Sequence, residues 1–288
     1  MHVRYSSEST LSEHCAQTDH LDYRRAAALA GLLDRPAPAV GDPLPPLWHL
    51  IYFLPLAAQS ELGPDGHPRQ GLPSPPRAGM RRLFAGGRIT FAGALMVGDD
   101  AEARTDVIRS VDKDTRSGGR IRFVTSRTEI RVDDRVILTE ERDIAYLEPA
   151  TPSTPAPTPT GQSVGTDTAI EHLRAEALQH RSIAVDPTLL FRFSALTYNA
   201  HRIHYDLSYA REVEGHRGLV VHGPLQALLM AELAEAVRGP MTGHTFGYRL
   251  ASPLYLGEGL TVLARSPEQL CIADDKGHIT ATAEIISI

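Results

Sequence analysis

Apolar and polar residues alternate along much of the first half of the chain, beginning at Met80. A period of two residues is typical of antiparallel strands that bury one face and expose the other. Turn-forming pairs separate the alternating segments, at Gly98-Asp99, Gly118-Gly119 and Asp133-Asp134. The pattern therefore predicts four strands, at residues 87–91, 105–111, 120–130 and 135–146.

Before these strands the pattern favours helices. Apolar positions from Asp19 to Leu33 follow helical spacing, and the prolines that come soon after Asp34 end the segment. The solidly apolar residues 44–54, which begin among prolines, predict a second, buried helix. Residues 55–76 are rich in glycine and proline and predict a long loop.

A similar order returns in the second half of the chain. Helical spacing occurs near residues 169–180, and a long apolar helix is predicted at 223–237. An apolar run that starts at Leu189 predicts a buried strand, and Leu219 starts a shorter strand-like run. Four more strands are predicted at 244–250, 259–265, 269–273 and 278–286. One buried helix followed by about four antiparallel strands, twice over, predicts an α+β fold in which two helix-wrapping sheets pair edge to edge.

A segment without helical or strand periodicity separates the two halves. Residues 149–160 consist almost entirely of proline, threonine, alanine and serine. Such a sequence is extended and does not pack against a core. We therefore predict a first domain at residues 1–148, a linker at 149–163 and a second domain at 164–288.

Composition narrows the classes of function. A net charge of −6 gives no general attraction to nucleic acid or to an anionic membrane. No apolar run is long enough to span a bilayer, and the N-terminal residues lack the apolar core of a signal peptide. Cys15 and Cys271 lie far apart without a metal-site spacing, which favours a reducing compartment. We expect a cytoplasmic protein without nucleic-acid or membrane partners.

The polar segment 198–206, Tyr-Asn-Ala-His-Arg-Ile-His-Tyr-Asp, carries the strongest chemical signal. His204 could hold a water molecule and accept its proton near neutral pH; the alternative is a histidine hydrogen-bonded in a turn. Asn199 can orient that water or His204 but cannot transfer a proton. Asp206 fits a turn or helix cap. His201, His204 and Asp206 could instead bind a metal, but no further ligand is evident, so we expect no metal.

The start of the long helix gives a second signal. Gly223 permits close backbone approach, Pro224 fits the first helical position, and the free N–H groups favour negative charge. Such a helix end could stabilise the enolate oxygen of a thioester; the alternative is a capped helix without a ligand. The sequence contains no dinucleotide fingerprint, phosphate loop or nucleophile elbow. The candidate substrate contacts are Arg192, Tyr198, Arg202, His222 and Arg249.

Residues 198–206 resemble the signature of the MaoC-like (R)-specific enoyl-CoA hydratases, Gly-Asp-x-Asn-Pro-(Ile/Leu)-His-x-(Asp/Glu). In this comparison His204 takes the place of the catalytic histidine, and Asn199 that of the catalytic aspartate. Residues 221–225 are similar to the helix opening whose glycine N–H contributes the oxyanion hole of that family. The block is also similar to one branch, the mesaconyl-C4-CoA (3-methylfumaryl-CoA) hydratases and type 2 hydroxyacyl-thioester dehydratases. The agreement with that branch covers residues 42–288.

The resemblance implies a tandem double hot dog fold whose second half carries the chemistry. It implies reversible hydration of an α,β-unsaturated acyl-CoA without a cofactor: His204 activates water, Asn199 positions it and Gly223 polarises the thioester oxygen. A branched dicarboxylic substrate such as mesaconyl-C4-CoA would need a cation, for which Arg192 and Arg202 are the candidates. A fatty-acid 3-hydroxyacyl thioester dehydratase and a non-catalytic acyl-thioester-binding protein are the alternatives. We also expect a homodimer.

Overall fold

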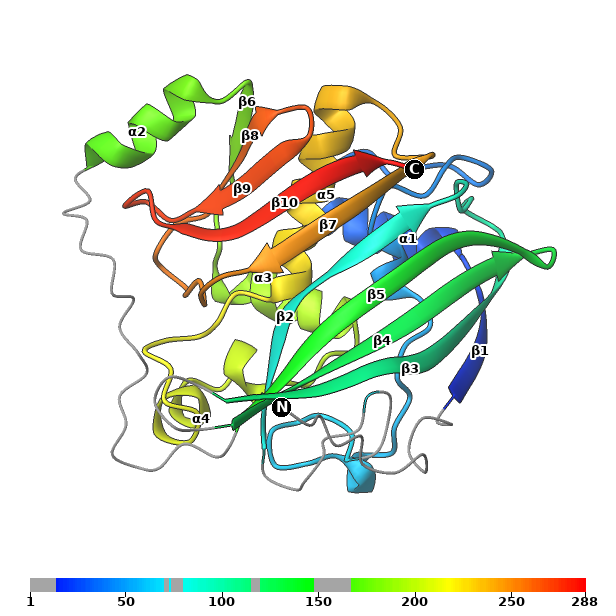
Figure 1. Cartoon of the computed structure of the whole chain (residues 1–288), viewed down its shortest axis with the longest axis horizontal. Helices are drawn as coiled ribbons and strands as arrows, with labels where there is room; N and C mark the ends of the chain where they lie inside the picture. The colour runs from blue at the N-terminus through cyan, green and yellow to red at the C-terminus, as the bar shows by residue number, and fades with distance from the viewer. Residues whose placement is uncertain (1–13, 70–72, 74–79, 115–119, 148–166) are drawn as a thin grey trace, which may run out of the picture.

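The computed structural model describes residues 14–69, 73, 80–114, 120–147 and 167–288. These residues form a fold built on one ten-stranded antiparallel sheet (Figure 1). In spatial order the strands are β1 (His14–His20), β3 (Asp100–Asp114), β4 (Arg120–Val132), β5 (Arg135–Leu147), β2 (Arg81–Phe91), β7 (His244–Leu250), β10 (Ile279–Ser287), β9 (Gln269–Ala273), β8 (Thr261–Ser266) and β6 (Gln179–Ser182). Strands from the same half of the chain lie together, and β2 pairs with β7, which confirms the predicted edge-to-edge pairing.

The eight strands that the alternation predicts are all present, as β2 to β5 and β7 to β10. The sequence pattern did not predict β1 and β6, the two outermost strands. Their side chains are mostly exposed, so neither carries the apolar stripe that marks a strand packed on a core.

Three of the predicted helices are confirmed: α1 (Tyr23–Leu32), α2 (Asp167–Glu176) and α5 (Gly223–Arg238). The predicted helix at residues 44–54 is wrong, because the segment forms only one 3-10 turn, η1 (Trp48–Ile51). Leu47 and Phe53, on either side of this turn, have positive φ angles of 66° and 52°, which interrupt helical geometry. The apolar side chains are nevertheless buried as expected, with Trp48 and Ile51 fully enclosed.

The predicted strand that starts at Leu189 is also wrong, because these residues form the helix α3 (Pro187–Leu196). The Asp186 side chain accepts a hydrogen bond from the Leu189 N–H at 2.7 Å, and Pro187 occupies the first turn. Leu190 and Phe193 are buried at helical spacing. The polar bend therefore follows directly after the C-terminal end of this helix.

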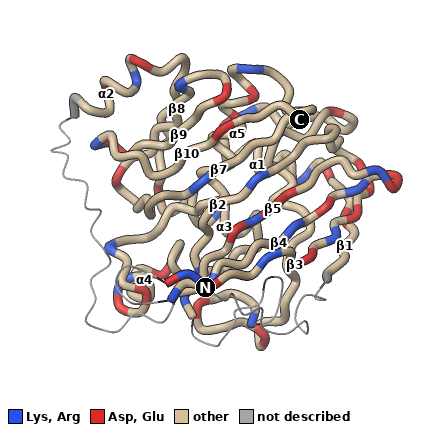
Figure 2. The backbone as a smooth tube through the Cα atoms, viewed as in Figure 1, with Lys and Arg blue, Asp and Glu red and all other residues tan. Residues whose placement is uncertain are grey.

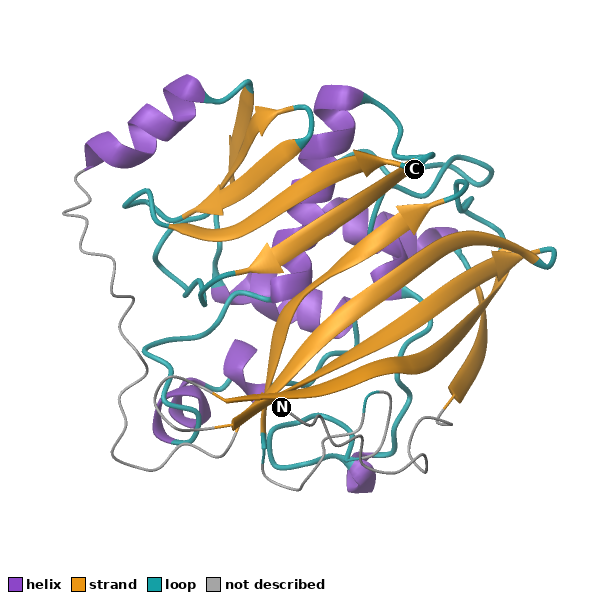
Figure 3. Cartoon of the chain, viewed as in Figure 1, coloured by secondary structure: helices purple, strands orange, loops and turns teal. Residues whose placement is uncertain are grey.

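The helices α1, α3 and α5 lie together on one side of the sheet (Figure 3), whereas α2 packs on the opposite face of β8 and β9. The long helix α5 contacts strands from both halves of the sheet, including β2, β7, β8 and β10. Residues 225–234 of this helix are all buried. A helix that is buried around its whole circumference fits the predicted core role and holds the start of α5 in a fixed position.

Charged side chains of both signs alternate across β3, β4 and β5 (Figure 2). Several form cross-strand ion pairs, as Arg122 does with Asp112 at 2.6 Å and Arg127 with Glu141 at 2.6 Å. Within the described residues, no helix is long and apolar enough to cross a membrane. The predicted linker at 149–163 and the turn at Gly118-Gly119 lie outside the described residues.

Candidate active site

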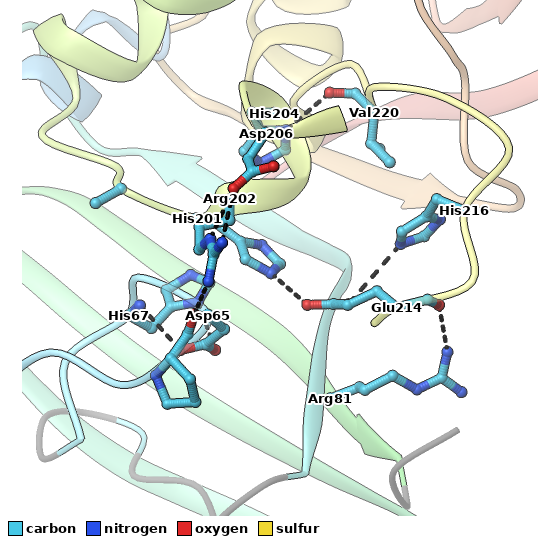
Figure 4. A network of polar contacts seen from close by, with 12 residues as sticks. Asp65, His67, Arg81, His201, Arg202, His204, Asp206, Glu214, His216 and Val220 are labelled. Carbon is cyan, nitrogen blue, oxygen red and sulfur yellow. Dashed lines mark hydrogen bonds and ion pairs between the residues drawn. The ribbon is translucent and has the colours of Figure 1, made fainter. Parts of the chain in front are cut away.

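His204 ends the short 3-10 turn η3 (Arg202–His204) and is buried, with 6% of its surface exposed. Its Nδ1 donates a hydrogen bond to the Val220 carbonyl oxygen at 2.8 Å (Figure 4). Because a carbonyl can only accept, Nδ1 carries the proton and Nε2 is the basic nitrogen. The backbone thus fixes both the tautomer and the direction of the ring, as a general base requires.

His204 stacks on the ring of His222, with centroids 3.7 Å apart and planes inclined by 20°. His222 is fully buried, and its Nε2 lies 2.8 Å from the hydroxyl of Ser194 on α3. Burial lowers the pKa of His222 to about 3. Burial, followed by the neighbouring His222 and His201 imidazoles, also holds the pKa of His204 well below its ordinary value. Both rings are therefore neutral at pH 7.

The stack brings His204 to the start of α5, because Gly223 directly follows His222. A side chain on Gly223 would meet Leu250 of β7 at 2.3 Å and Phe84 of β2 at 2.9 Å. A side chain at this position would have to displace Leu250 and Phe84, so glycine favours the close packing at this helix start. The His204 imidazole thus lies beside the start of α5, and Phe84 from the first half of the chain packs on this end.

Asn199 shapes the bend that carries His204. Its Oδ1 accepts a hydrogen bond from the His201 N–H at 3.0 Å, so the side chain closes a local turn. Asp206 caps α4 (Leu207–Glu212) by accepting from the Tyr209 N–H, as predicted. It also pairs with Arg202 at 2.7 Å. His201, His204 and Asp206 were considered from sequence as metal ligands. The Asp206 carboxylate instead binds the Tyr209 N–H and Arg202.

His201 joins the site to a buried carboxylate that the sequence analysis missed. Its Nε2 lies 3.0 Å from Glu214 Oε1, and both side chains are at most 5% exposed. The other carboxylate oxygen of Glu214 and Nε2 of His216 are 3.9 Å apart, and neither has a hydrogen-bond partner among the described residues. Glu214 and His216 follow α4 in a short polar loop, so no periodic pattern marks them.

A loop from the first half of the chain packs on this bend. The His67 ring lies 4.3 Å from the His201 ring, and its Nδ1 is 3.2 Å from Asp65 Oδ2. The Arg202 N–H donates to the Asp65 carbonyl at 2.9 Å. At Gly66, φ is 91° and a Cβ would lie only 1.8 Å from the Ala200 carbonyl oxygen. The first half therefore supplies polar groups to the site as well as covering it.

Asp65, His67 and His201 are residue types that bind transition metals, and their ligand atoms all lie within 4.8 Å of one another. Each already has a polar partner, since Asp65 bonds His67 and His201 bonds Glu214. Burial raises the pKa of Asp65, but the hydrogen bonds from His67 outweigh it and lower that pKa overall. These side chains are therefore bonded within their own halves, and the latch between the halves consists of the His67–His201 ring contact and the hydrogen bond from the Arg202 N–H to the Asp65 carbonyl.

The other candidate substrate contacts from the sequence lie at the surface. Arg192 is exposed on α3, and Arg249 is exposed on β7, opposite Gly86. Arg202 is held by Asp206 and by the Pro64 carbonyl, with its guanidinium over the Tyr209 ring. Tyr198 is 55% exposed at the end of α3. Of the predicted residues, the structure brings together His204, His222 and Gly223, with Asn199 on the same bend.

Known proteins are similar to this chain in sequence. Residues 47–256 match the model of the family described as hydroxyacyl-thioester dehydratase type 2. The mesaconyl-C(4)-CoA hydratase of Chloroflexus aurantiacus is 42% identical over 268 residues, which cover 92% of this chain and 91% of that protein. The mitochondrial hydroxyacyl-thioester dehydratase type 2 of Schizosaccharomyces pombe is 25% identical over 248 residues, covering 76% and 77% of the two chains.

Solved structures resemble the fold. HtdX of Mycobacterium tuberculosis superposes with a TM-score of 0.67 at 16% identity, over 96% of this chain and 100% of that chain. A second protein of the same organism, described as having a double hotdog fold, gives a TM-score of 0.57 at 14% identity over 96% of each chain. The predicted double hot dog fold is thereby confirmed.

Proposed function

This chain belongs to the hydroxyacyl-thioester dehydratase type 2 family, and from that premise we propose that it reversibly hydrates a dicarboxylic enoyl-CoA such as mesaconyl-C4-CoA. The hydro-lyase class and the MaoC-like resemblance expected from sequence are both confirmed by the family match. The dicarboxylic substrate is supported by the relative of 42% identity, whose name specifies it.

His204 is the proposed general base. Its unprotonated Nε2 takes a proton from water as the water oxygen bonds to the β carbon of the double bond. The displaced electron pair moves to the thioester oxygen, where the N–H groups at the start of α5 stabilise the enolate. Collapse of the enolate takes the proton back from His204 to the α carbon. The net change adds H and OH across the double bond, without a redox step.

The observation that carries this assignment is the stack of His204 on His222, the residue next to Gly223. It places a neutral, correctly protonated imidazole beside a helix end that favours negative charge. Asn199 supports the base indirectly in this proposal, by holding the bend through the His201 N–H.

Replacing the base tests the proposal. His204→Ala should lower kcat for hydration by at least about 100-fold, the usual contribution of a general base, and leave the circular dichroism spectrum unchanged. The assay uses purified protein with mesaconyl-C4-CoA, crotonyl-CoA and a long-chain enoyl-CoA, which also separates the dicarboxylic substrate from the fatty-acid alternative. His20→Ala, at an exposed histidine of β1, is the control. Turnover by His204→Ala within a few-fold of the unmodified protein would reject the role.

A further inference from the structure

Arg82 belongs to β2, the strand of the first half whose Phe84 packs at the start of α5. It is the second residue of β2 and pairs with Tyr146 of β5. Side chains two residues apart on a strand share a face, so Arg82 lies on the same face as Phe84. Phe84 packs directly on the Gly223 position. Arg82 therefore lies on the strand face that borders the proposed oxyanion site.

The charge of Arg82 is not neutralised by an ion pair within the described residues. Asp65, the carboxylate that interacts electrostatically with Arg82, accepts hydrogen bonds from His67 at both oxygens, and Arg142 on the neighbouring strand pairs with Glu140 at 2.7 Å. Arg82 is partly buried, and burial lowers the pKa of its guanidinium. An arginine still remains charged at neutral pH. A desolvated, unpaired cation is costly in a fold unless an anion comes to it.

A short series of side chains links Arg82 to the proposed base. Arg82 interacts electrostatically with His67 and Asp65. The His67 ring lies 4.3 Å from His201, whose ring lies 5.6 Å from His204. In mesaconyl-C4-CoA a methyl group and a free carboxylate are both attached to the β carbon, where water adds. The carboxylate receptor must therefore lie on the side of the base to which Arg82 is connected through His67 and His201.

We propose that Arg82 binds the free carboxylate of a dicarboxylic acyl thioester. The inference rests on the proposed function, and it replaces Arg192 and Arg202, the surface residues suggested by sequence. A planar guanidinium binds a carboxylate through two parallel N–H···O bonds, so it also fixes which substituent of the β carbon faces the water.

The test compares acids with their neutral isosteres. Mesaconyl-C4-CoA and 3-methylbut-2-enoyl-CoA differ only in a carboxylate against a methyl group. Arg82→Gln should lower kcat/KM for the acid about 100-fold, mainly by raising KM, and change that for the neutral thioester less than threefold. Arg88→Gln is the matched control, because Arg88 lies on the same strand, exposed and paired with Glu141. Equal losses on both substrates in a folded variant would overturn the inference.

A binding measurement separates this inference from the proposed reaction. Succinyl-CoA and butyryl-CoA form a saturated acid and neutral pair that cannot be hydrated. By calorimetry, the unmodified protein should bind succinyl-CoA at least about tenfold more tightly, and Arg82→Gln should remove that preference. Arg82→Lys, which keeps the charge but not the planar fork, should retain part of it. Absence of the preference in the unmodified protein would reject the carboxylate site, whether or not the protein turns over enoyl thioesters.

Discussion

His204 and His222 stay neutral because they are buried, and this sets the expected pH dependence. His204 must be unprotonated to accept a proton, and burial holds its pKa well below 6.5. The active form therefore persists as the pH falls through 6.5, and protonation removes activity only at lower pH. We predict that kcat/KM for hydration changes little between pH 7.5 and 6.5, with its acidic limb below that range. A profile already at half its maximum near pH 6.5 would contradict the burial argument, provided circular dichroism shows an intact fold.

Single residues of the site were predictable where a motif marks them and were missed where tertiary contacts assemble them. His204, His222 and Gly223 belong to two short segments with recognisable chemistry, and the structure brings them together. Glu214 has no such signal, because its partner His201 becomes apparent only once the bend has folded. Arg82 looked like any charged residue at the start of a strand.

The helices and strands with a long, regular apolar pattern were predicted correctly. The segments whose secondary structure depends on residues at their ends were predicted wrongly. The eight predicted strands and the helix α5 carry periodic apolar faces over many residues. The segment at α3 is apolar at most positions, which does not separate a buried strand from a buried helix. Its Asp186-Pro187 cap decides the outcome, and the positive φ angle of Leu47 shortens η1 in the same local way.

The latch between the first-half loop and the bend that carries His204 predicts how one added methyl group at Gly66 affects activity and stability. Gly66→Ala would place Cβ 1.8 Å from the Ala200 carbonyl oxygen, so the loop must move away. We expect kcat/KM to fall at least about tenfold and the free energy of unfolding to fall by about 1–3 kcal/mol. Gly41→Ala is the control, because Gly41 has a similar φ of 88° but nothing within 4 Å of the added carbon. Equal effects of the two changes on activity would show that the latch does not support the site.

At the scale of the whole molecule, a buried carboxylate joins the two halves. Glu232 of α5 accepts a hydrogen bond from Trp48 Nε1 at 2.9 Å and pairs with Arg35 at 2.7 Å. Arg35 is 36% exposed and so contributes little, whereas the enclosed indole N–H would lose its acceptor. We predict that Glu232→Ala lowers the free energy of unfolding by about 2 kcal/mol in urea, followed by the fluorescence of the single tryptophan.

Glu235 provides the comparison for that measurement. It lies three residues later on α5 and is less buried than Glu232, and its side chain has no hydrogen bond or ion pair among the described residues. Glu235→Ala should change the free energy of unfolding by less than about 0.5 kcal/mol. If both variants lost the same stability, the contact with Trp48 would not be what holds α5 to the first half.

The pairing of β2 with β7, which joins the two halves of the chain, determines how the site responds to dilution of the protein. Phe84, Asp65 and His67 come from one half of the chain, and His204 and Gly223 from the other. When such groups belong to separate polypeptides, the fraction of complete sites declines as the protein becomes scarce. Here one continuous backbone carries both contributions, so their mutual effective concentration is set by covalent connection. Even at very low abundance, the histidine and its covering loop stay together.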